Sequence, residues 1–291
     1  MRWKKVTLVG VGLLGGSLGA ALKRKRLADS VVGLVRRKVS VRECLRAGAV
    51  DSATLNFFEA IEGAELIVLC TPIAQMGPLL EQMLPALRRG TIITDVGSVK
   101  TTVVQELEPL ASSVGAHFVG SHPMAGAEKM GVAAARPDLF EDAMCVITPT
   151  VRSNQRATQK VSALWRSIGA RLMRLSPARH DELVSRSSHL PHIVAATLAR
   201  LVLDPAWPKE QSLLCATGFR DSTRIASGSP EMWRDIEISN GQNVIKALDI
   251  FIRDLKSVRN LVAKRNPRLI EGFLNEAKQR RDQWRELGNN S

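Results

Sequence analysis

The chain has 291 residues, of which 45% are hydrophobic, so it can bury a sizeable core and is not intrinsically disordered. Its formal net charge of +13 comes from lysines and arginines spread along the chain, and only 4% of its residues are aromatic. Few side chains could therefore stack on bases, which favours small anionic ligands over nucleic acid as partners. No apolar run reaches the roughly 20 residues that cross a bilayer, so we expect no membrane partner.

The cysteines and the N-terminus bear on the compartment. Cys44, Cys70, Cys145 and Cys215 lie far apart, form no C-x-x-C pair and have no histidine at ligand spacing. This pattern predicts reduced thiols and no metal site. The N-terminal MRWKKVTLVGVGLLGG superficially resembles a signal peptide, but its glycine spacing is better explained below as a binding turn, so the sequence predicts a cytoplasmic protein.

Short apolar runs alternate with helical patterns over the first 176 residues. The runs that indicate strands are 6–9, 31–35, 66–70, 91–96, 118–119, 145–148 and 171–175. The patterns that indicate helices are 14–25, 41–47, 73–87, 101–112 and 155–168. Alternation at this spacing predicts βαβ units and an α/β domain with a parallel, doubly wound sheet.

From Pro177 onward the strand signals fade and helical patterns dominate, over 180–203 with an interruption at Pro191, and over 230–261. One apolar stripe repeats there at three- and four-residue spacing: Val244, Leu248, Phe251, Leu255, Val258 and Val262. We therefore expect two domains, an α/β domain at 1–176 and an all-helical domain at 177–291. The stripe is long for so small a domain, which predicts that part of it packs against a second subunit.

The sequence from Gly10 to Gly15 is G-x-G-x-x-G, between a predicted strand and a predicted helix. Gly10 permits a tight turn, Gly12 lets the backbone approach a pyrophosphate, and Gly15 lets the helix pack on the strand. Leu13 and Leu14 begin the helix, whose free N–H groups bind anions. In this context the motif predicts a Rossmann-type dinucleotide site, and the alternative is a glycine-rich turn without a ligand.

The end of the second predicted strand bears on which dinucleotide binds. An NAD site usually has Asp or Glu there to bind the ribose hydroxyls. Here the strand ends in Arg36, Arg37 and Lys38, with no carboxylate. Arginine suits a 2′-phosphate, so the sequence favours NADP over NAD, and the alternative is that these cations are a solvated turn.

Further polar residues follow the next predicted strands. Thr71 and Pro72 end one buried strand, and Asp95 and Ser98 end the next. Because ligands of doubly wound sheets bind at the carboxyl ends of the strands, we expect these residues near the cofactor.

Five segments in order carry a family resemblance: GVGLLGGSLG, DVGSVK, GSHPMAGAEKMG, SSHLPH and GFRDSTRIASGSPEMW. Together they resemble the prephenate/arogenate dehydrogenase family of tyrosine biosynthesis. The resemblance implies a dinucleotide-binding domain followed by a helical dimerisation domain, and hence a homodimer. It also implies oxidative decarboxylation of prephenate or arogenate with hydride transfer to NAD(P)+, which gives 4-hydroxyphenylpyruvate or tyrosine.

The resemblance also implies roles for individual residues. His122 matches the catalytic histidine, which polarises the substrate hydroxyl, and Ser98 matches a serine beside it. The residues implied in the substrate pocket or its gate are Arg224, His192, His189, Ser121, Glu128, Asp221 and Trp233. Simpler alternatives are that Arg224 pairs with Asp221 along a helix, that Trp233 is ordinary core and that Ser121 caps a turn.

Two alternatives concern the whole chain, and one feature departs from the family. Another two-domain dehydrogenase, such as a β-hydroxyacid dehydrogenase or a pyrroline-carboxylate reductase, would lack the GSHPMAG loop. A non-catalytic dinucleotide-sensing protein would not need His122, Ser98 and Arg224. The family often has an acid at the end of the second strand, where this chain has Val35-Arg36, which again bears on NAD against NADP.

Overall fold

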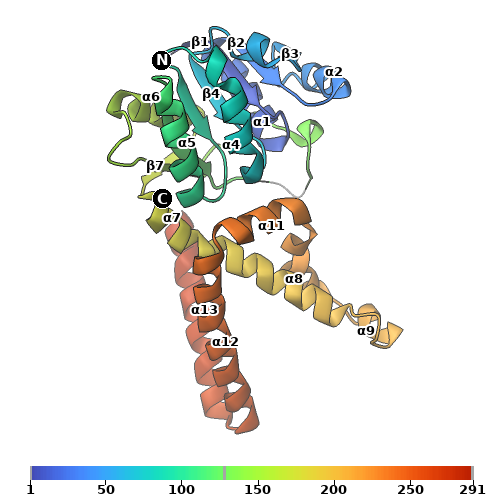
Figure 1. The fold of residues 1–291 in the computed structure, drawn as a ribbon. Helices are drawn as coiled ribbons and strands as arrows, with labels where there is room; N and C mark the ends of the chain where they lie inside the picture. Colours follow the sequence, from blue (N-terminus) through green and yellow to red (C-terminus); the bar gives the residue numbers. More distant parts are fainter. Residues whose placement is uncertain (1, 127–128, 290–291) are drawn as a thin grey trace. The chain divides into compact units, whose positions relative to one another are not determined.

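The computed structural model describes residues 2–126 and 129–289 (Figure 1). The chain divides into two compact units between Asn243 and Val244. The first unit holds a sheet and the helices through α11, and the second consists of two long helices. In the described part of the chain, no helix is long and apolar enough to cross a membrane.

The sheet has eight strands in the order β3-β2-β1-β4-β5-β6-β7-β8. Its strands are β1 (Trp3–Val9), β2 (Ala28–Leu34), β3 (Ser52–Thr54), β4 (Leu66–Leu69), β5 (Ile92–Asp95), β6 (His117–Pro123), β7 (Met144–Thr148) and β8 (Arg171–Arg174). β4 is buried along its whole length, which accounts for its uninterrupted apolar sequence LIVL. The strand order reverses beside β1, between β2 and β4, and this reversal opens a ligand crevice in folds of this type.

All neighbouring strands run parallel except β6 and β7, which pair antiparallel with Ser121 opposite Ile147. A parallel neighbour needs a crossover that returns the chain to the same end of the sheet, usually through a helix. Among the described residues between β6 and β7, the only helical element is the short 3-10 turn η2 (Val132–Ala134), so no α-helix of that part makes such a crossover. The predicted doubly wound sheet is thus confirmed, as a mostly parallel one.

Helices cover both faces of this sheet. The helices of the first unit's α/β part are α1 (Leu13–Arg24), α2 (Lys38–Arg46), α3 (Phe57–Ile61), α4 (Ile73–Met83), α5 (Thr101–Ser113) and α6 (Gln155–Ser167), with the 3-10 turn η1 (Leu84–Ala86). One buried cluster joins α1, α2 and α6 to the sheet, and a second joins α3, α4 and α5 to it. Figure 1 shows α4 and α5 side by side on one face.

The chain is helical after β8. The remaining elements of the first unit are α7 (Pro177–Val184), the π turn η3 (Ser185–His189), α8 (Leu190–Val202), α9 (Lys209–Leu213), α10 (Thr217–Thr223), the 3-10 turn η4 (Arg224–Ser227) and α11 (Pro230–Ser239). Ser176 and Ser229 cap α7 and α11, because each side chain accepts a hydrogen bond from the backbone N–H of the third residue of its helix. The predicted interruption at Pro191 corresponds to the π turn just before it.

The second unit contains most of α12 (Gly241–Ala263) and α13 (Pro267–Asn289). Several large apolar side chains of this unit are exposed: Ile245, Ile250, Ile252, Leu255, Val262, Leu269, Phe273, Leu274 and Trp284. These side chains are exposed apolar surface on the two helices of this unit.

Candidate active site

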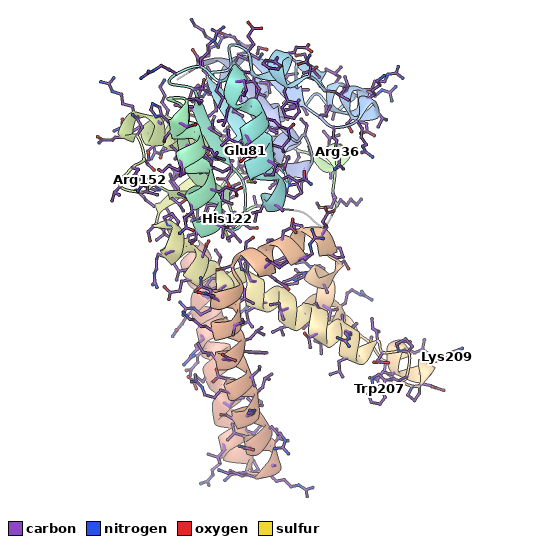
Figure 2. All side chains as sticks on the ribbon, viewed as in Figure 1. Arg36, Glu81, His122, Arg152, Trp207 and Lys209 are labelled. Carbon is purple, nitrogen blue, oxygen red and sulfur yellow. The ribbon has the colours of Figure 1, made fainter. Side chains whose placement is uncertain are left out.

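A cavity of about 350 Å³ lies at the carboxyl ends of β1, β4, β5 and β6, and residues of α11 complete its wall. The residues of the sequence-based site that line it are Gly12, Leu13, Leu14, Thr71, Pro72, Ser98, His122 and Trp233. The structure thus brings together the glycine turn, two strand ends, the histidine loop and a tryptophan from the helical region. Figure 2 shows His122 at the end of the sheet that is nearest α11.

The glycine turn has the geometry that a dinucleotide needs. Gly10 has φ +86°, which favours glycine, and a Cβ on Gly15 would lie 2.2 Å from the Gly10 carbonyl oxygen. In contrast, a Cβ on Gly12 would meet nothing within 4 Å, so the space beside this backbone is open. The first turn of α1 carries no acidic side chain, and its free N–H groups begin at the cavity wall.

Thr71 adds a second sign of a ligand. It follows β4 and lines the cavity, and its Oγ1 is buried without a hydrogen-bond partner in the described part of the chain. Buried hydroxyl groups nearly always make a hydrogen bond, so the Thr71 hydroxyl indicates that a bound molecule or a water supplies its partner. The open backbone at Gly12 and the unpaired Thr71 hydroxyl together fit a dinucleotide.

Arg36 and Arg37 lie just beyond the end of β2 and are both exposed. They are not part of the cavity lining. In Figure 2 Arg36 lies toward the β2 edge of the sheet, whereas His122 lies in β6, and β1, β4 and β5 lie between these two strands in the sheet order. The adenosine half of a dinucleotide extends toward the second strand of such a sheet, away from the nicotinamide. Their position is therefore compatible with a contact to that half.

His122 is the buried histidine of the cavity, with 7% of its surface exposed. It lies in β6 because the strand continues through Pro123, and its Nδ1 is 2.8 Å from Nε2 of His180. Burial lowers the pKa of His122 well below its usual 6.5, and the neighbouring His180, Lys100 and His189 lower it further. The imidazole is therefore neutral near pH 7, as an acceptor of a substrate proton must be.

Ser121 and Asp95 lie next to the cavity without lining it. The Ser121 side chain is on the opposite face of β6 from His122, where Oγ bonds the Asp95 carbonyl oxygen at 2.5 Å and accepts from Trp165 Nε1 at 3.0 Å. The buried Asp95 carboxylate accepts the N–H groups of Gly97 and Ser121 and pairs with Lys100. These bonds hold the loop that carries Ser98 into the cavity.

Three aromatic residues meet at the wall that α11 provides. The Trp233 ring stacks on His192, with centroids 3.6 Å apart and planes 9° from parallel, and meets His189 edge to face at 6.2 Å. Only Trp233 lines the cavity itself. Burial lowers the pKa of His192 and lowers that of His189 to about 4, so both rings are neutral near pH 7.

His192 retains unused hydrogen-bonding capacity. Neither of its ring nitrogens has a hydrogen-bond partner among the described residues. Glu237 Oε1 lies 3.9 Å from Nδ1, which is too long for a hydrogen bond. The two ring nitrogens are therefore buried polar groups whose hydrogen bonds remain unmade in this part of the protein.

The remaining substrate residues of the sequence-based site lie elsewhere. Arg224 at the start of η4 and Asp221 in α10 are exposed and do not line the cavity. Glu128 lies outside the described residues. In the described ranges, no group of three or more His, Cys, Asp or Glu side chains is arranged to hold a metal ion.

Sequence reasoning missed the residues behind His122. His180 and Asp181 in α7 are both buried, and His180 Nδ1 lies 2.8 Å from Asp181 Oδ1. Lys100, also buried, reaches Asp95 and the Ser121 carbonyl oxygen. The adjacent His-Asp pair at the start of a helix is the signal that could have pointed to them.

Comparison with known proteins identifies the family. A sequence model described as "Prephenate dehydrogenase, nucleotide-binding domain" matches residues 18–174, and one described as "Prephenate dehydrogenase, dimerization domain" matches residues 176–275. A prephenate dehydrogenase of Bacillus subtilis is 34% identical over 280 residues, which are 95% of this chain and 75% of that protein. A cyclohexadienyl dehydrogenase of Zymomonas mobilis is 34% identical over 283 residues, which are 96% of this chain and 95% of that protein.

Solved structures agree. The crystal structure of prephenate dehydrogenase from A. aeolicus, in complex with hydroxyphenyl propionate and NAD+, superposes with a TM-score of 0.91. It is 29% identical and covers 97% of this chain and 99% of its own. A 3-hydroxyisobutyrate dehydrogenase from Salmonella typhimurium reaches only 0.57 at 14% identity, so it shares the fold alone and the β-hydroxyacid alternative is not favoured. The two matched domain models and the two relatives, which align with nearly the whole chain, show that this protein belongs to the prephenate dehydrogenase family of NAD(P)-dependent oxidoreductases.

Proposed function

We propose that this protein catalyses the oxidative decarboxylation of prephenate, arogenate or both, with NAD(P)+ as hydride acceptor. The observation that carries the proposal is the neutral, buried His122 imidazole in the same cavity as the glycine turn. In this reaction a hydride leaves the ring carbon that bears the hydroxyl, carbon dioxide leaves the opposite carbon, and the ring becomes aromatic. The protein has to position the ring and to take the hydroxyl proton.

The cofactor supplies the acceptor for the hydride when it is bound. The residues that would hold it are Gly10, Gly12 and Gly15 in the turn and Leu13 and Leu14 in the first turn of α1. Thr71 and Pro72 line the cavity next to this turn, where a Cβ on Gly10 would lie 2.9 Å from Thr71 Cγ2, and the unpaired Thr71 hydroxyl supports a contact with the ligand. Asp95 is fully paired inside the protein, so we assign it an indirect role in holding the Ser98 loop.

His122 accepts the proton of the substrate hydroxyl in this proposal. Its Nδ1 is engaged by His180, whereas Nε2 has no hydrogen-bond partner in the described part of the protein. Nε2 is therefore the nitrogen that meets the hydroxyl. Ser98 lines the cavity at the end of β5 and orients either the hydroxyl or the imidazole.

The substrate's carboxylates and side chain meet residues of the helical region. Arg224 provides a guanidinium fork for a carboxylate, and His192 and His189 present neutral rings beside Trp233. Glu128 and Asp221 are proposed at the gate. Ser121 lies behind β6, so its contribution is to fix the strand beside His122.

Arg36 and Arg37 favour NADP over NAD, because two exposed guanidinium groups follow β2 where no carboxylate is available for a ribose. We also propose a homodimer formed by the helical region from residue 177 onward. The exposed apolar face of α12 and α13 and the match to a dimerization-domain model support it. The four cysteines are all free, which supports a cytoplasmic location.

The test is direct turnover. Purified protein is mixed with prephenate and, separately, with arogenate, each with NADP+ and with NAD+, while the absorbance of the reduced cofactor is followed. We expect reduction with at least one substrate, and faster reduction with NADP+. No turnover with either substrate would reject the proposed activity, and 3-hydroxyisobutyrate serves as the control substrate for the related fold.

A further inference from the structure

A chain of buried side chains extends away from His122 on the side opposite the cavity. His122 Nδ1 lies 2.8 Å from His180 Nε2, and His180 Nδ1 lies 2.8 Å from Asp181 Oδ1. His180 is fully shielded from solvent, and Asp181 nearly so. The hydrogen bonds from Asp181 through His180 to His122 are therefore shielded from water.

The Asp181 carboxylate is held as an anion by the backbone around it. Oδ1 accepts the N–H of Lys100 at 2.8 Å, and Oδ2 accepts the N–H of Thr101 at 2.8 Å, where α5 begins. The hydrogen bonds from His180, Lys100 and Thr101 outweigh the effect of burial, so that the pKa of this carboxyl is lowered. An ionised carboxylate can only accept hydrogen bonds.

This acceptor decides where the protons of both histidines lie. His180 must donate from Nδ1, since a lone pair there would face the carboxylate oxygen. A neutral His180 then has a lone pair at Nε2, so the facing Nδ1 of His122 must carry its hydrogen. His122 is left with a lone pair at Nε2.

We infer that His180 and Asp181 are positioning residues that fix His122 in the tautomer with hydrogen on Nδ1, so that Nε2 is the proton acceptor in the cavity. The inference deepens the proposed function and rests on it. In the reaction, His122 Nε2 takes the substrate hydroxyl proton while Nδ1–H continues to donate to His180. No proton needs to move to Asp181, and the aligned acceptor at His180 stabilises the imidazolium that forms.

The charged and titratable groups that face His122 are His180, His189 and Lys100. Lys100 lies beside the strand with its ammonium on Asp95 and the Ser121 carbonyl oxygen. A cation there opposes protonation of His122, as a positive charge on His180 or His189 also would, whereas the Nε2 lone pair of an uncharged His180 favours it. Removal of that lone pair should therefore reduce the basicity of His122 in the reaction.

Two isopolar variants of His180 separate the roles of its nitrogens. The side-chain amide of His180→Gln reaches the position of Nε2 and can present an oxygen to His122. The amide of His180→Asn reaches only the position of Nδ1, so it keeps the donor to Asp181 and loses the contact with His122. A purely structural role predicts equal turnover for the two, after correction for their unfolding midpoints.

We expect His180→Asn to lower kcat by about 100-fold, within the range of general-base effects, with KM and the Kd for NADPH changed less than about threefold. His180→Gln should recover at least about tenfold of that loss. The acidic limb of the kcat–pH profile of His180→Asn should also shift toward lower pH, because its His122 is the weaker base and loses its proton at a lower pH. Equal kcat values for the two variants at equal stability would overturn the inference.

The tautomers can also be read without any substrate. The chain contains only five histidines, so selective ¹⁵N labelling of the full-length protein gives a simple two-bond ¹H–¹⁵N spectrum, in which His122→Asn identifies the His122 signals. We expect the His122 and His180 signals to show protonated Nδ1 and unprotonated Nε2 at pH 7. A protonated Nε2 on His122 would overturn the inference whether or not the protein turns over prephenate, and absence of turnover with the expected spectrum would reject only the proposed activity.

Discussion

Lys100 and Asp95 form an ion pair whose two side chains are completely buried beside the cavity. Asp95 also accepts the N–H groups of Gly97 and Ser121, and Lys100 also donates to the Ser121 carbonyl oxygen. The pair therefore ties the loop after β5 to the strand that carries His122.

Lys100→Met should destabilise the protein strongly, because it leaves the Asp95 carboxylate buried without its cation. We expect the free energy of unfolding in urea to fall by about 3–5 kcal/mol. Adding Asp95→Asn should recover part of that loss, so that the double variant loses less than the sum of the two single ones. Lys278→Met removes the exposed pair with Asp282 and should leave the urea midpoint unchanged. An equally small effect of Lys100→Met would show that the buried pair does not hold the site together.

Gly12→Ala and Gly15→Ala should affect the protein in different ways. A Cβ on Gly12 has no atom within 4 Å, so this variant should fold with an unchanged unfolding midpoint yet bind NADPH at least about tenfold more weakly. A Cβ on Gly15 would collide with the Gly10 carbonyl oxygen, so that variant should lose stability as well. Fluorescence titration with NADPH and thermal unfolding give both readouts. Unchanged NADPH affinity in a folded Gly12→Ala would exclude a pyrophosphate at this turn.

The double variant Arg36→Ala/Arg37→Ala should raise the KM for NADP+ far more than that for NAD+, by about tenfold or more for two lost charge-assisted contacts. Arg88→Ala/Arg89→Ala changes the net charge equally, at exposed positions before the amino end of β5, and should leave the ratio of the two KM values unchanged. Equal weakening of both cofactors by the first variant would contradict a role in 2′-phosphate binding.

His122→Asn should lower kcat by roughly 10²–10⁴-fold, since the amide keeps a group at the position of Nδ1 but offers nothing at that of Nε2. The hydrogen bond to His180 can persist, so NADPH affinity and the unfolding midpoint should stay close to those of the unmodified protein. Steady-state turnover with prephenate, together with an NADPH titration, measures both. A kcat within threefold of the unmodified value would remove His122 from the proposed mechanism.

Acidification should destabilise the fold through its buried histidines. Burial lowers the pKa of His122, His189 and His192, while in the unfolded chain each titrates near 6.5. Above pH 6.5 these histidines are neutral in both the folded and the unfolded chain, so they do not change the unfolding free energy. Below pH 6.5 the unfolded chain binds more protons than the folded one, so the unfolding free energy falls. His189, whose pKa is lowered to about 4, should alone contribute a loss of roughly 3 kcal/mol by pH 4.

Urea unfolding at several pH values between 7.5 and 4 measures this slope. His189→Gln should make the slope shallower, since it removes one of the groups that bind protons only on unfolding. A slope as steep as that of the unmodified protein would show that His189 titrates normally in the fold.

Local sequence patterns were sufficient to predict those parts of the site that a single continuous segment forms. Gly12, Thr71, Pro72 and Ser98 line the cavity, and their position at strand ends and in a glycine turn follows from short-range rules. β3 was missed because Ser52–Thr54 is too short to show any alternation. The roles of Ser121 and His122 were not separated because the predicted strand stopped at Val119, whereas β6 runs to Pro123 and puts them on opposite faces.

The groups behind His122 could not be predicted in this way. His180 lies 58 residues further along the chain, and its contact depends on how α7 packs against the end of β6. The same holds for Trp233, whose stacking on His192 brings together two helices. Tertiary packing determines such contacts, and no local pattern in a single sequence predicts them.

The π turn at Ser185–His189 sets the angular phase of the helix that follows it. Each residue of an α-helix advances the side-chain direction by about 100°, so one additional residue in a turn rotates everything after it by about that angle. His189 ends this turn, His192 follows it in α8, and both rings contact Trp233. Deletion of one of the residues before His189 here would leave His189, His192 and Trp233 in the chain and yet turn His192 away from the tryptophan, so the length of this segment is as much a part of the site as the residues in it.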